Sequence, residues 1–372
     1  MQPVICHIST VHHDDDVRIF YRECMSLAAN GYEVHLVITA ENDCKKNNVH
    51  VHALKPVKSR LFRMIFMPWV VMAKALKTKA KIIHYHDPEL IFVGFILRCF
   101  FTKAVIFDIH ETFTRQVMSK AYLPKWCRKA VGYIYSFAES IFLVGQQIIV
   151  ANAKSKEDYP DRAFLVQNYP VIVNDFQQEN KQSNTIPSIV YIGALEEIRG
   201  VMLYLQLAKN LKNSGRQFTM ILIGHYNPAL GKKMNDYIEK HQLHDCVKIA
   251  GRIPWDQAMP IVSKATIGLC ILLPEPNYTS CLATKILEYM MVGVPTLASD
   301  FELWRPYVDG VGSGRMVNPL DIDQITKVCS EMLDDPETLE RMSRAGYEAI
   351  REKYNWNIEF KNLLKCYQKC LN

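Results

Sequence analysis

Short apolar runs of strand length alternate with longer segments of helical periodicity along almost the whole chain. The runs are nearly continuous rather than alternating with polar residues, which is typical of parallel strands covered by helices on both faces. In the first half they span residues 3–9, 33–39, 81–86, 103–109, 147–152 and 163–167. Helical patterns lie between them at 17–30, where Gly31 provides a C-terminal cap, and at 59–79, 89–101 and 123–142.

The second half repeats this alternation after a polar interruption. Residues 174–187 lose the apolar pattern and are expected to form a linker. Beyond it, strands are expected at 188–193, 217–224, 246–251, 266–273 and 295–299, and helices at 201–211, 229–241, 255–263, 283–291 and 322–333. Two further helical patterns, at 336–353 and 356–371, have no strand after them. The pattern predicts an α/β protein with two doubly wound, Rossmann-like domains.

The expected domains are an N-terminal domain at 1–173, the linker, a C-terminal domain at 188–353, and a final helix within 354–372 that returns to the first domain. A chain of 372 residues, 49% of them hydrophobic, is long enough to form two cores. Ligands of open parallel sheets bind beyond the carboxyl ends of the strands. Two such sheets facing each other therefore predict a binding site in a cleft between the domains.

Charge and cysteine content narrow the class of protein. The formal net charge of +6 is uneven, since residues 1–170 carry 22 Lys and Arg against 15 Asp and Glu, and the remainder 22 against 23. The basic half suits an anionic partner, although ordinary solvated lysines would produce the same excess. Eleven cysteines without a Cys-x-x-Cys pair fit neither a disulfide framework nor a zinc ribbon and indicate a reducing compartment. No basic cluster coincides with a nucleic-acid-binding motif, so no nucleic-acid partner is expected.

Membrane contact is expected to be peripheral at most. Arg98 and Lys103 interrupt the longest apolar stretch, 90–109, and no secretory signal opens the chain. Segment 61–76 mixes large apolar residues with basic ones, and predicts either an amphipathic helix on a membrane or a helix packed in the core. Pro68 argues against a long interfacial helix. We expect a cytoplasmic protein that is able to associate with the inner membrane face.

The stretch TKILEYMMVGVPTLASD, residues 284–300, places one lysine and one glutamate in an otherwise apolar run. Thr284, Lys285 and Glu288 share one face of the predicted helix. Because this helix follows a strand and a loop, its N-terminal amides and Lys285 suit a phosphate. The carboxylate of Glu288 is able to accept two hydrogen bonds from vicinal hydroxyls, such as those of a ribose. A solvated lysine–glutamate pair is the alternative interpretation.

Two further candidate positions follow strands. Gly193, Arg199 and Gly200 combine a glycine turn, a cation and a helix start, which is a plausible diphosphate cradle, although a plain surface arginine is also consistent with the pattern. His110 closes the strand at 103–109 with Glu111 beside it, and is the candidate catalytic residue. A lone histidine at a strand end is more often structural.

Two other polar groups are candidates in the first domain. His86 and Asp87 follow a strand, and Asp87 also fits as a cap of the next helix. In segment 12–18, imidazoles and carboxylates alternate, but adjacent side chains point in different directions and rarely chelate one ion. Asp16 is therefore expected to cap the next helix, Arg18 to face the cleft, and no metal to be bound. The absence of Gly-x-Gly-x-x-Gly after the first strand argues against a dinucleotide oxidoreductase.

The run from Pro276-Asn277 through residues 283–300 resembles the donor-binding signature of the family 4 glycosyltransferases, which have the GT-B fold. Within that family the chain is similar to the bacterial capsule, O-antigen and exopolysaccharide branch. Weaker similarities extend along the whole chain, at His12, Asp16, Arg18, His86-Asp87, 108–111, 168–170, 193–200 and 354–356.

The resemblance implies a retaining transfer of a sugar from a UDP- or GDP-linked donor to a glycan or lipid-linked acceptor, with no further cofactor. It implies that Glu288 binds the ribose, that Arg199 and Lys285 hold the diphosphate, and that His110 contacts the donor sugar. The remaining candidates are donor-side Gly193, Gly200, Thr284, Asn277 and, in the expected base loop, Arg252, and acceptor-side Asp16, Arg18, His86, Asp87 and Glu111.

The chain departs from the family pattern at two positions. Ser280 stands where the family often has a second glutamate, and Glu275 is the nearest carboxylate. Ala194 stands at the arginine position of the phosphate loop, and Arg199 at its lysine position. No residue is a convincing covalent nucleophile. A nucleotide-sugar epimerase of the same fold and a non-catalytic nucleotide-sugar-binding module remain alternatives.

Overall fold

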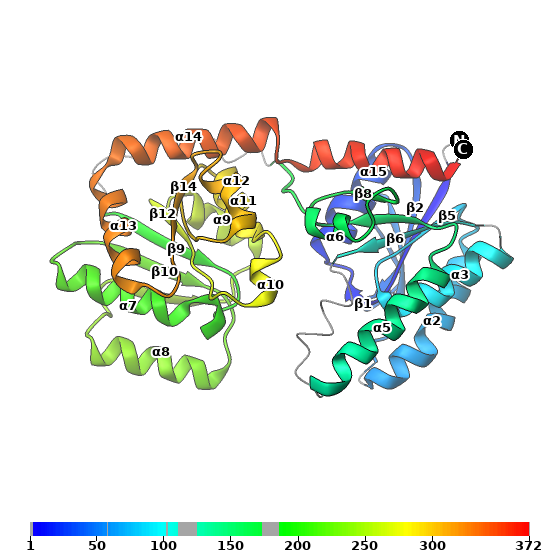
Figure 1. Ribbon diagram of the computed structural model, residues 1–372, viewed down its shortest axis with the longest axis horizontal. Coiled ribbons are helices and arrows are strands. Elements are labelled where there is room, and N and C mark those ends of the chain that lie inside the picture. Colours follow the sequence, from blue (N-terminus) through cyan, green and yellow to red (C-terminus); the bar gives the residue numbers. More distant parts are fainter. Residues whose placement is uncertain (1–2, 58, 102, 111–124, 173–185, 372) are drawn as a thin grey trace. The chain divides into compact units, whose positions relative to one another are not determined.

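The chain folds into two compact units, which a computed structural model describes over residues 3–57, 59–101, 103–110, 125–172 and 186–371 (Figure 1). Unit 1 contains Met1–Asn168 and Trp356–Asn372, and unit 2 contains Tyr169–Asn355. Each unit has one sheet with helices on both faces, so the expected pair of doubly wound α/β domains is confirmed. Nearly all of the expected linker, and Glu111, lie outside the described residues.

Unit 1 is built on an eight-stranded sheet in the order β3-β4-β2-β1-β5-β6-β7-β8. Strands β3 and β4 pair antiparallel, and the other neighbours pair parallel. The central strands are buried on both faces, which explains their nearly continuous apolar runs. The strands are β1 (Val4–His13), β2 (Glu33–Thr39), β3 (Cys44–Lys46), β4 (Val49–Leu54), β5 (Ile82–Tyr85), β6 (Ala104–Ile109), β7 (Gln147–Val150) and β8 (Ala163–Leu165).

Two apolar clusters cover the opposite faces of this sheet. The first forms under α2, α3 and the end of α5, and the second forms under η1, α1 and the C-terminal helix α15. The helices are η1 (Val17–Cys24, π-helical), α1 (Met25–Ala29), α2 (Arg60–Lys77), η2 (Pro88–Leu90), α3 (Ile91–Phe100), α5 (Lys125–Phe142), α6 (Ala153–Glu157) and α15 (Trp356–Leu371).

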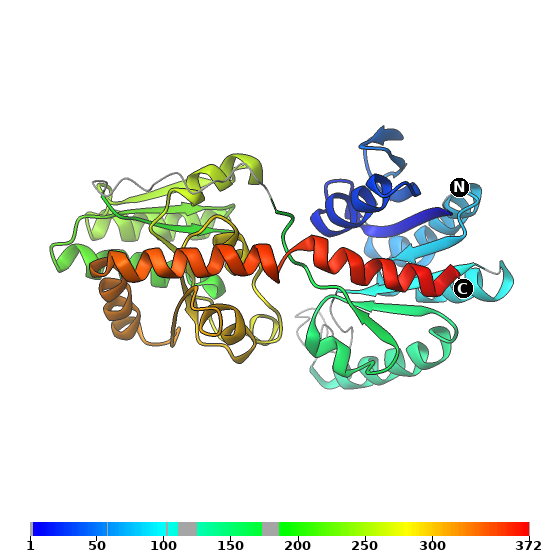
Figure 2. The same cartoon turned by 90° about the horizontal axis from the view of Figure 1, so that it is seen from above.

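Helix α15 returns to unit 1, as expected from the sequence (Figures 1 and 2). It packs against β6, β7 and β8 and buries Trp356, Leu363 and Tyr367. The carboxylate of Glu359 also accepts a hydrogen bond from the backbone N–H of Gln167 at 2.8 Å. The core of unit 1 therefore depends on residues from both ends of the chain.

Unit 2 is built on a six-stranded parallel sheet in the order β11-β10-β9-β12-β13-β14. Its strands are β9 (Ser188–Ile192), β10 (Thr219–Ile223), β11 (Val247–Gly251), β12 (Ile267–Cys270), β13 (Thr296–Ser299) and β14 (Gly314–Val317). Its helices are η3 (Glu197–Arg199), α7 (Val201–Asn213), α8 (Pro228–Lys240), α9 (Trp255–Ser263), α10 (Pro276–Thr279), α11 (Thr284–Met291), η4 (Glu302–Trp304), α12 (Arg305–Val308), α13 (Ile322–Asp334) and α14 (Pro336–Glu352).

Three strands, the helix expected at 17–30 and several short helices, α6, α10, α12, η3 and η4, differ from the sequence-based prediction. Strands β3, β4 and β14 were not predicted, because none is an apolar run: β4 has the sequence VHVHAL, and β3 and β14 are short and partly polar. The single helix expected at 17–30 is instead η1 followed by α1.

Helix α2 combines the two alternatives considered for segment 61–76. Met67, Val71 and Ala75 face the core, whereas several large apolar side chains on the same helix are exposed. Pro68 lies inside the helix without ending it, so the expected helix break is wrong. Among the described helices, none combines the length and apolarity that crossing a bilayer requires.

Candidate active site

Helix α11 places a buried cation beside a partly exposed carboxylate. Lys285 is only 8% exposed, and its ammonium lies 5.3 Å from the centre of the Tyr191 ring. Burial, together with the nearby charge of Arg199, lowers the pKa of Lys285. No described carboxylate forms a salt bridge with this lysine. An anionic ligand would therefore relieve an electrostatic cost that the folded protein carries.

Glu288 lies one turn after Lys285, and Thr284 is exposed at the start of the same helix. The indole Nε1 of Trp255 donates to Oε1 of Glu288 at 3.2 Å. This bond fixes the direction of the carboxylate, and carboxylate oxygens in general accept more than one donor. Trp255 lies on α9 and is itself partly exposed, so it forms part of the same surface.

The loop between β9 and α7 approaches Lys285 through a glycine. Gly193 has φ +139°, and a Cβ there would lie 3.1 Å from Tyr191 Oη and 3.4 Å from Lys285 Cε. Gly200 has φ +78°, and a Cβ there would lie 2.0 Å from the carbonyl oxygen of Ile271. Both positions therefore need glycine for the chain to pass this close.

Arg199 lies in the same loop and is half-buried. Its Nε donates to Oε2 of Glu196 at 3.0 Å, and its guanidinium lies 5.7 Å from the centre of the Tyr278 ring. The structure thus brings Gly193, Arg199, Lys285 and Glu288 into one neighbourhood at the end of β9. Tyr191 was not a sequence-based candidate, although its position inside β9, two residues before Gly193, was available as a signal.

The remaining donor-side candidates are less closely held. Asn277 is exposed on the short helix α10, and Arg252 is exposed just after β11. Ser280, at the departure from the family pattern, donates its hydroxyl proton to the carbonyl of Pro276 at 2.7 Å. Glu275 precedes α10 with its side chain exposed.

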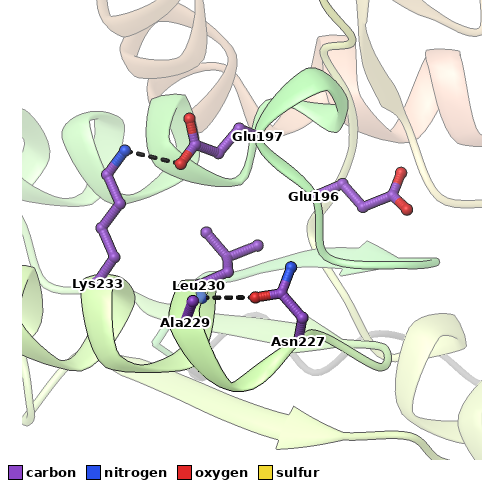
Figure 3. A pocket seen from close by; sticks show the side chains of 6 residues that line it. All are labelled: Glu196, Glu197, Asn227, Ala229, Leu230 and Lys233. Carbon is purple, nitrogen blue, oxygen red and sulfur yellow. Dashed lines mark hydrogen bonds and ion pairs between the residues drawn. The ribbon is translucent and has the colours of Figure 1, made fainter. Parts of the chain in front are cut away.

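A cavity of about 380 Å³ lies beside the β9–α7 loop, but none of the predicted donor residues lines it (Figure 3). Its walls carry the carboxylates of Glu196 and Glu197, and Lys233 is paired with Glu197 at 2.7 Å. Asn227 caps α8 by accepting from the N–H of Leu230 at 2.8 Å. Two carboxylates disfavour a diphosphate, so this cavity is distinct from the candidate donor site.

Unit 1 contains a buried ion pair between Arg18 and Asp108. Arg18 Nε donates to Oδ2 of Asp108 at 2.7 Å, and Nη2 donates to Oδ1 at 2.9 Å. Nη1 of the same guanidinium donates to Val166 and Asn168. Burial raises the pKa of Asp108, but Arg18 and the adjacent His110 and His86 outweigh it and hold that pKa well below its usual range.

The expectation that Arg18 faces a cleft is therefore wrong. Its side chain is 4% exposed, and its donors are directed to partners inside unit 1. Asp16, in contrast, caps η1 as expected, accepting from the N–H groups of Arg18 and Ile19. Since the guanidinium is fully engaged, Arg18 acts by positioning Asp108 rather than by binding a ligand.

The sequence allowed Asp87 to cap the following helix, but its side chain makes no capping hydrogen bond. Its Oδ2 instead accepts from the hydroxyl of Ser9 at 2.9 Å and from the N–H of Thr10 at 2.6 Å. The side chain reaches across to the neighbouring strand β1 because β1 and β5 run parallel and end at the same edge. Asp87 therefore fixes the second half of β1, beyond its pairing with β5.

His12 and His110 lie at this edge of the sheet, with ring centres 5.3 Å apart. His12 Nδ1 lies 2.7 Å from Oδ2 of Asp16. Burial lowers the pKa of His12, but the contact with Asp16 outweighs it and raises the pKa overall. His110 Nε2 lies 3.3 Å from Oδ2 of Asp108, and its side chain is 24% exposed. His110 is thus held by a carboxylate while one side stays accessible, which suits a group that contacts substrate.

His86 is buried beneath these residues. Its Nδ1 lies 3.2 Å from Oδ2 of Asp108, and its Nε2 lies 3.0 Å from Nδ1 of His7. His7, Glu23 and His84 were not sequence-based candidates, because they come from three different elements. The only local signal was the pair of histidines two residues apart at 84 and 86, which share one face of a strand.

Two family models match the chain. The model described as "Glycosyl transferases group 1" matches residues 173–349, and the model described as "Glycosyltransferase Family 4" matches residues 17–152. The two matches correspond closely to the two α/β units, which form the GT-B type of fold. The chain belongs to the family 4 glycosyltransferases.

Individual proteins are similar over different shares of the chain. An alpha-D-kanosaminyltransferase of Streptomyces kanamyceticus is 28% identical over 49% of this chain, which spans 46% of that protein. An MMP alpha-(1->4)-mannosyltransferase of Mycolicibacterium hassiacum is 22% identical, and the match covers 77% of this chain and 70% of the length of that protein. The crystal structure of Anabaena Alr3699/HepE in complex with UDP-glucose is similar to this fold with a TM-score of 0.75 and 11% identity. The match covers 99% of this chain and 100% of the HepE chain.

Proposed function

We propose that this protein transfers a sugar from a nucleotide-sugar donor to a glycan or a lipid-linked oligosaccharide in the synthesis of a surface polysaccharide. The observation that carries the proposal is the grouping of Arg199, Lys285 and Glu288 around the end of β9. Two cations beside glycine-bearing backbone suit a diphosphate, and a carboxylate one helical turn away suits a ribose. The UDP-glucose in the similar Anabaena structure supports a uridine diphosphate donor over a guanosine one.

In the proposed reaction, breaking the bond between the sugar and the diphosphate develops negative charge on the leaving group. Arg199 and Lys285 would stabilise this charge, and preorganised groups of this kind supply several kcal/mol. Lys285 is well suited because its ammonium is buried and has no described carboxylate as ion-pair partner. We propose that His110 contacts the donor sugar and that Asp16, His86 and Asp87 shape the acceptor side. The names of both relatives specify an alpha configuration of the transferred sugar, which corresponds to retention when the donor is alpha-linked.

A nucleotide-sugar panel tests this proposal. The purified protein is incubated with UDP- and GDP-sugars, with and without a membrane lipid extract, and release of nucleoside diphosphate and formation of sugar products are followed. Acceptor-dependent release with an alpha-configured product, identified by NMR, is the expected result. Isomerised donor without an acceptor would identify an epimerase, and binding without turnover would identify a non-catalytic module.

We further propose that unit 1 contacts the cytoplasmic face of a membrane through α2, α3 and α5. Helix α3 contacts both of the others (Figure 1). The rings of Trp69 on α2 and Phe92 on α3 lie 6.0 Å apart. Large apolar side chains are exposed on each helix, including Phe66 on α2, Phe100 on α3 and Phe137 on α5. An exposed apolar surface of this kind marks an interaction site.

The charge around this surface favours anionic lipid as its partner. Between residues 55 and 81 the chain carries eight Lys and Arg and no Asp or Glu. Basic residues beside an inserted apolar face attract an anionic leaflet by about 1 kcal/mol each. Partial insertion would also remove the aromatic side chains from water.

Co-sedimentation with vesicles tests the membrane proposal. The protein should sediment with phosphatidylglycerol vesicles and much less with phosphatidylcholine vesicles. The double variant Phe66→Ser and Phe137→Ser should lose binding, because it removes apolar contacts on two helices. Leu320→Ser removes an equally exposed apolar side chain from unit 2 and is the control. Equal sedimentation of the double variant and the control would refute a role for this surface.

A further inference from the structure

Four side chains with metal-binding atoms meet inside unit 1, on the sheet face covered by α15. His7 lies on β1, Glu23 on η1, His84 on β5, and His86 directly after β5. All four are buried, with at most 3% exposure. The parallel register of β1 and β5 pairs His7 with His84, and His86 follows two residues later on the same strand face.

The distances among these side chains match a small coordination shell. His7 Nδ1 lies 3.0 Å from His86 Nε2. Oε2 of Glu23 lies 3.7 Å from His7 Nδ1 and 3.9 Å from His86 Nε2. Zinc bonds of about 2.0–2.1 Å in a tetrahedron separate the ligand atoms by roughly 3.3 Å. One candidate ligand atom from each of the four residues lies within 4.8 Å of the others, so these atoms would move closer together around a bound ion.

Hydrogen bonds around the cluster orient two of the imidazoles. His86 Nδ1 lies 3.2 Å from Oδ2 of Asp108. A carboxylate that is held ionised by a guanidinium can only accept, so the His86 proton sits on Nδ1 and the Nε2 lone pair faces the cluster. His7 Nε2 lies 3.0 Å from the Tyr367 hydroxyl, so its Nδ1 is the nitrogen directed toward His86 and Glu23. The same hydroxyl lies 2.7 Å from His84 Nδ1.

Several polar atoms of the cluster lack the partners that buried groups normally have. Within the described part of the chain, neither carboxylate oxygen of Glu23 has a hydrogen-bond partner, and neither does His84 Nε2. Arg18 Nε lies 3.2 Å from Oε1 of Glu23, but it donates to Asp108 instead. A buried carboxylate without hydrogen bonds is costly, and a cation bound by it removes that cost.

We propose that His7, Glu23, His84 and His86 bind one zinc ion as a structural site. Three imidazoles and one carboxylate in a tetrahedral arrangement are a typical zinc shell. The site is closed and fully buried, so it offers no open position for a substrate or a reactive water. The ion would tie together β1, η1 and β5, the elements that also carry Arg18 and the part of β1 held by Asp87. The proposed sugar transfer routes no step through the ion, which would affect it only by fixing His86 on the acceptor side.

The direct test is the metal content of the full-length protein, purified without chelators and with any affinity tag removed. Inductively coupled plasma mass spectrometry should find about one zinc ion per chain. Cobalt bound in its place should give the intense visible absorption of tetrahedral Co²⁺. Retention of no metal after incubation with Zn²⁺ and gel filtration would overturn the proposal and identify the cluster as a hydrogen-bonded network.

Variants then locate the ion. Glu23→Gln should lose the zinc, whereas the double variant His35→Gln and His50→Gln should keep it. The latter removes two stacked histidines elsewhere in unit 1 and controls for adventitious binding by histidine. Zinc retained by Glu23→Gln but lost by the control would contradict the assignment.

Because a variant of a buried ligand can fail to fold, a milder substitution gives an independent measurement. Tyr367→Phe keeps the ring and removes only the hydroxyl that contacts His7 and His84. Loss of such an outer hydrogen bond should weaken zinc affinity by about 10- to 100-fold in a chelator competition. Unchanged affinity would show that the ion binds elsewhere. Metal content and affinity are measured without any sugar substrate, so this test succeeds or fails independently of the proposed transfer.

Discussion

The charged groups of the two units differ in what neutralises them. In unit 2, Lys285 has no described carboxylate as ion-pair partner, and the described ion pair of Arg199 is with the partly exposed Glu196. In unit 1, Arg18 and Asp108 neutralise each other inside the protein through two hydrogen bonds. Charges that lack a buried partner are available to a ligand, whereas charges paired in the interior hold the fold. Charge type alone does not separate these roles, but burial and partners do.

The largest effect should come from breaking the buried pair in unit 1. Arg18→Met leaves Asp108 and Glu23 buried without a guanidinium, so the free energy of unfolding of unit 1 should fall by roughly 3–5 kcal/mol. Chemical denaturation measures this, and Arg98→Met, which alters an exposed arginine of the same unit, is the control. An unchanged midpoint would mean that the pair contributes little.

Lys285→Met should have a similarly large effect, on catalysis rather than on folding. The substitution keeps an apolar stem and removes the charge that we assign to the leaving diphosphate. We expect kcat/KM for the donor to fall by about 10²–10³-fold, with little change in thermal unfolding. Steady-state kinetics and calorimetry measure the two effects. Wild-type kinetics in the variant would remove Lys285 from the donor site.

Glu139 is a buried carboxylate of unit 1 for which no described cation forms an ion pair, so it tests whether a buried charge without a charged partner destabilises the fold. It is buried, accepts a hydrogen bond from the Tyr159 hydroxyl at 3.0 Å, and has a pKa raised by burial to about 7. Because its folded-state pKa exceeds the unfolded value, its stabilising contribution is complete below about pH 4.3 and is lost as the pH rises through about 7.

Glu139→Gln should therefore stabilise unit 1 at pH 8 by about 3 kcal/mol relative to its effect at pH 4. Unfolding free energies of the wild-type protein and the variant at the two pH values measure this. Glu157→Gln, at an exposed position in α6, should show almost no difference. If Glu139→Gln changes the free energy of unfolding equally at both pH values, the raised pKa of Glu139 is contradicted.

The smallest expected effect is a change in how kcat/KM for the donor depends on pH. The pKa of Lys285 is lowered, so kcat/KM for the donor should decline at a lower pH than an ordinary lysine would cause. Lys285→Arg stays charged, and should shift this alkaline limb upward while costing a few-fold in activity near neutral pH. Coincident alkaline limbs would show that another group controls the decline.

The features predicted from sequence were those encoded within a few consecutive residues. Apolar runs identified most of the parallel strands, and segment 284–288 provided the cation and the carboxylate that we propose for the donor site. Strand β4 was missed because its histidines alternate with apolar residues, so it does not form a continuous run.

The buried network of unit 1 was not predictable in this way. Arg18 and Asp108 are 90 residues apart in the chain, and which carboxylate a guanidinium reaches depends on the order of strands in the sheet. The dependence on strand order also explains why the capping interpretation of Asp87 was wrong. A short aspartate before a helix usually caps it, but here the end of the neighbouring strand offers better-placed donors.

The return of α15 to unit 1 has a consequence for the order of folding. Ribosomes produce unit 2 as one uninterrupted stretch, so it can fold as soon as Asn355 has emerged. The core of unit 1, by contrast, lacks Trp356, Leu363 and Tyr367 until all of unit 2 has been translated. The nascent first half must therefore wait with the part of one sheet face that α15 covers still exposed, and chaperone capture during translation should be concentrated there.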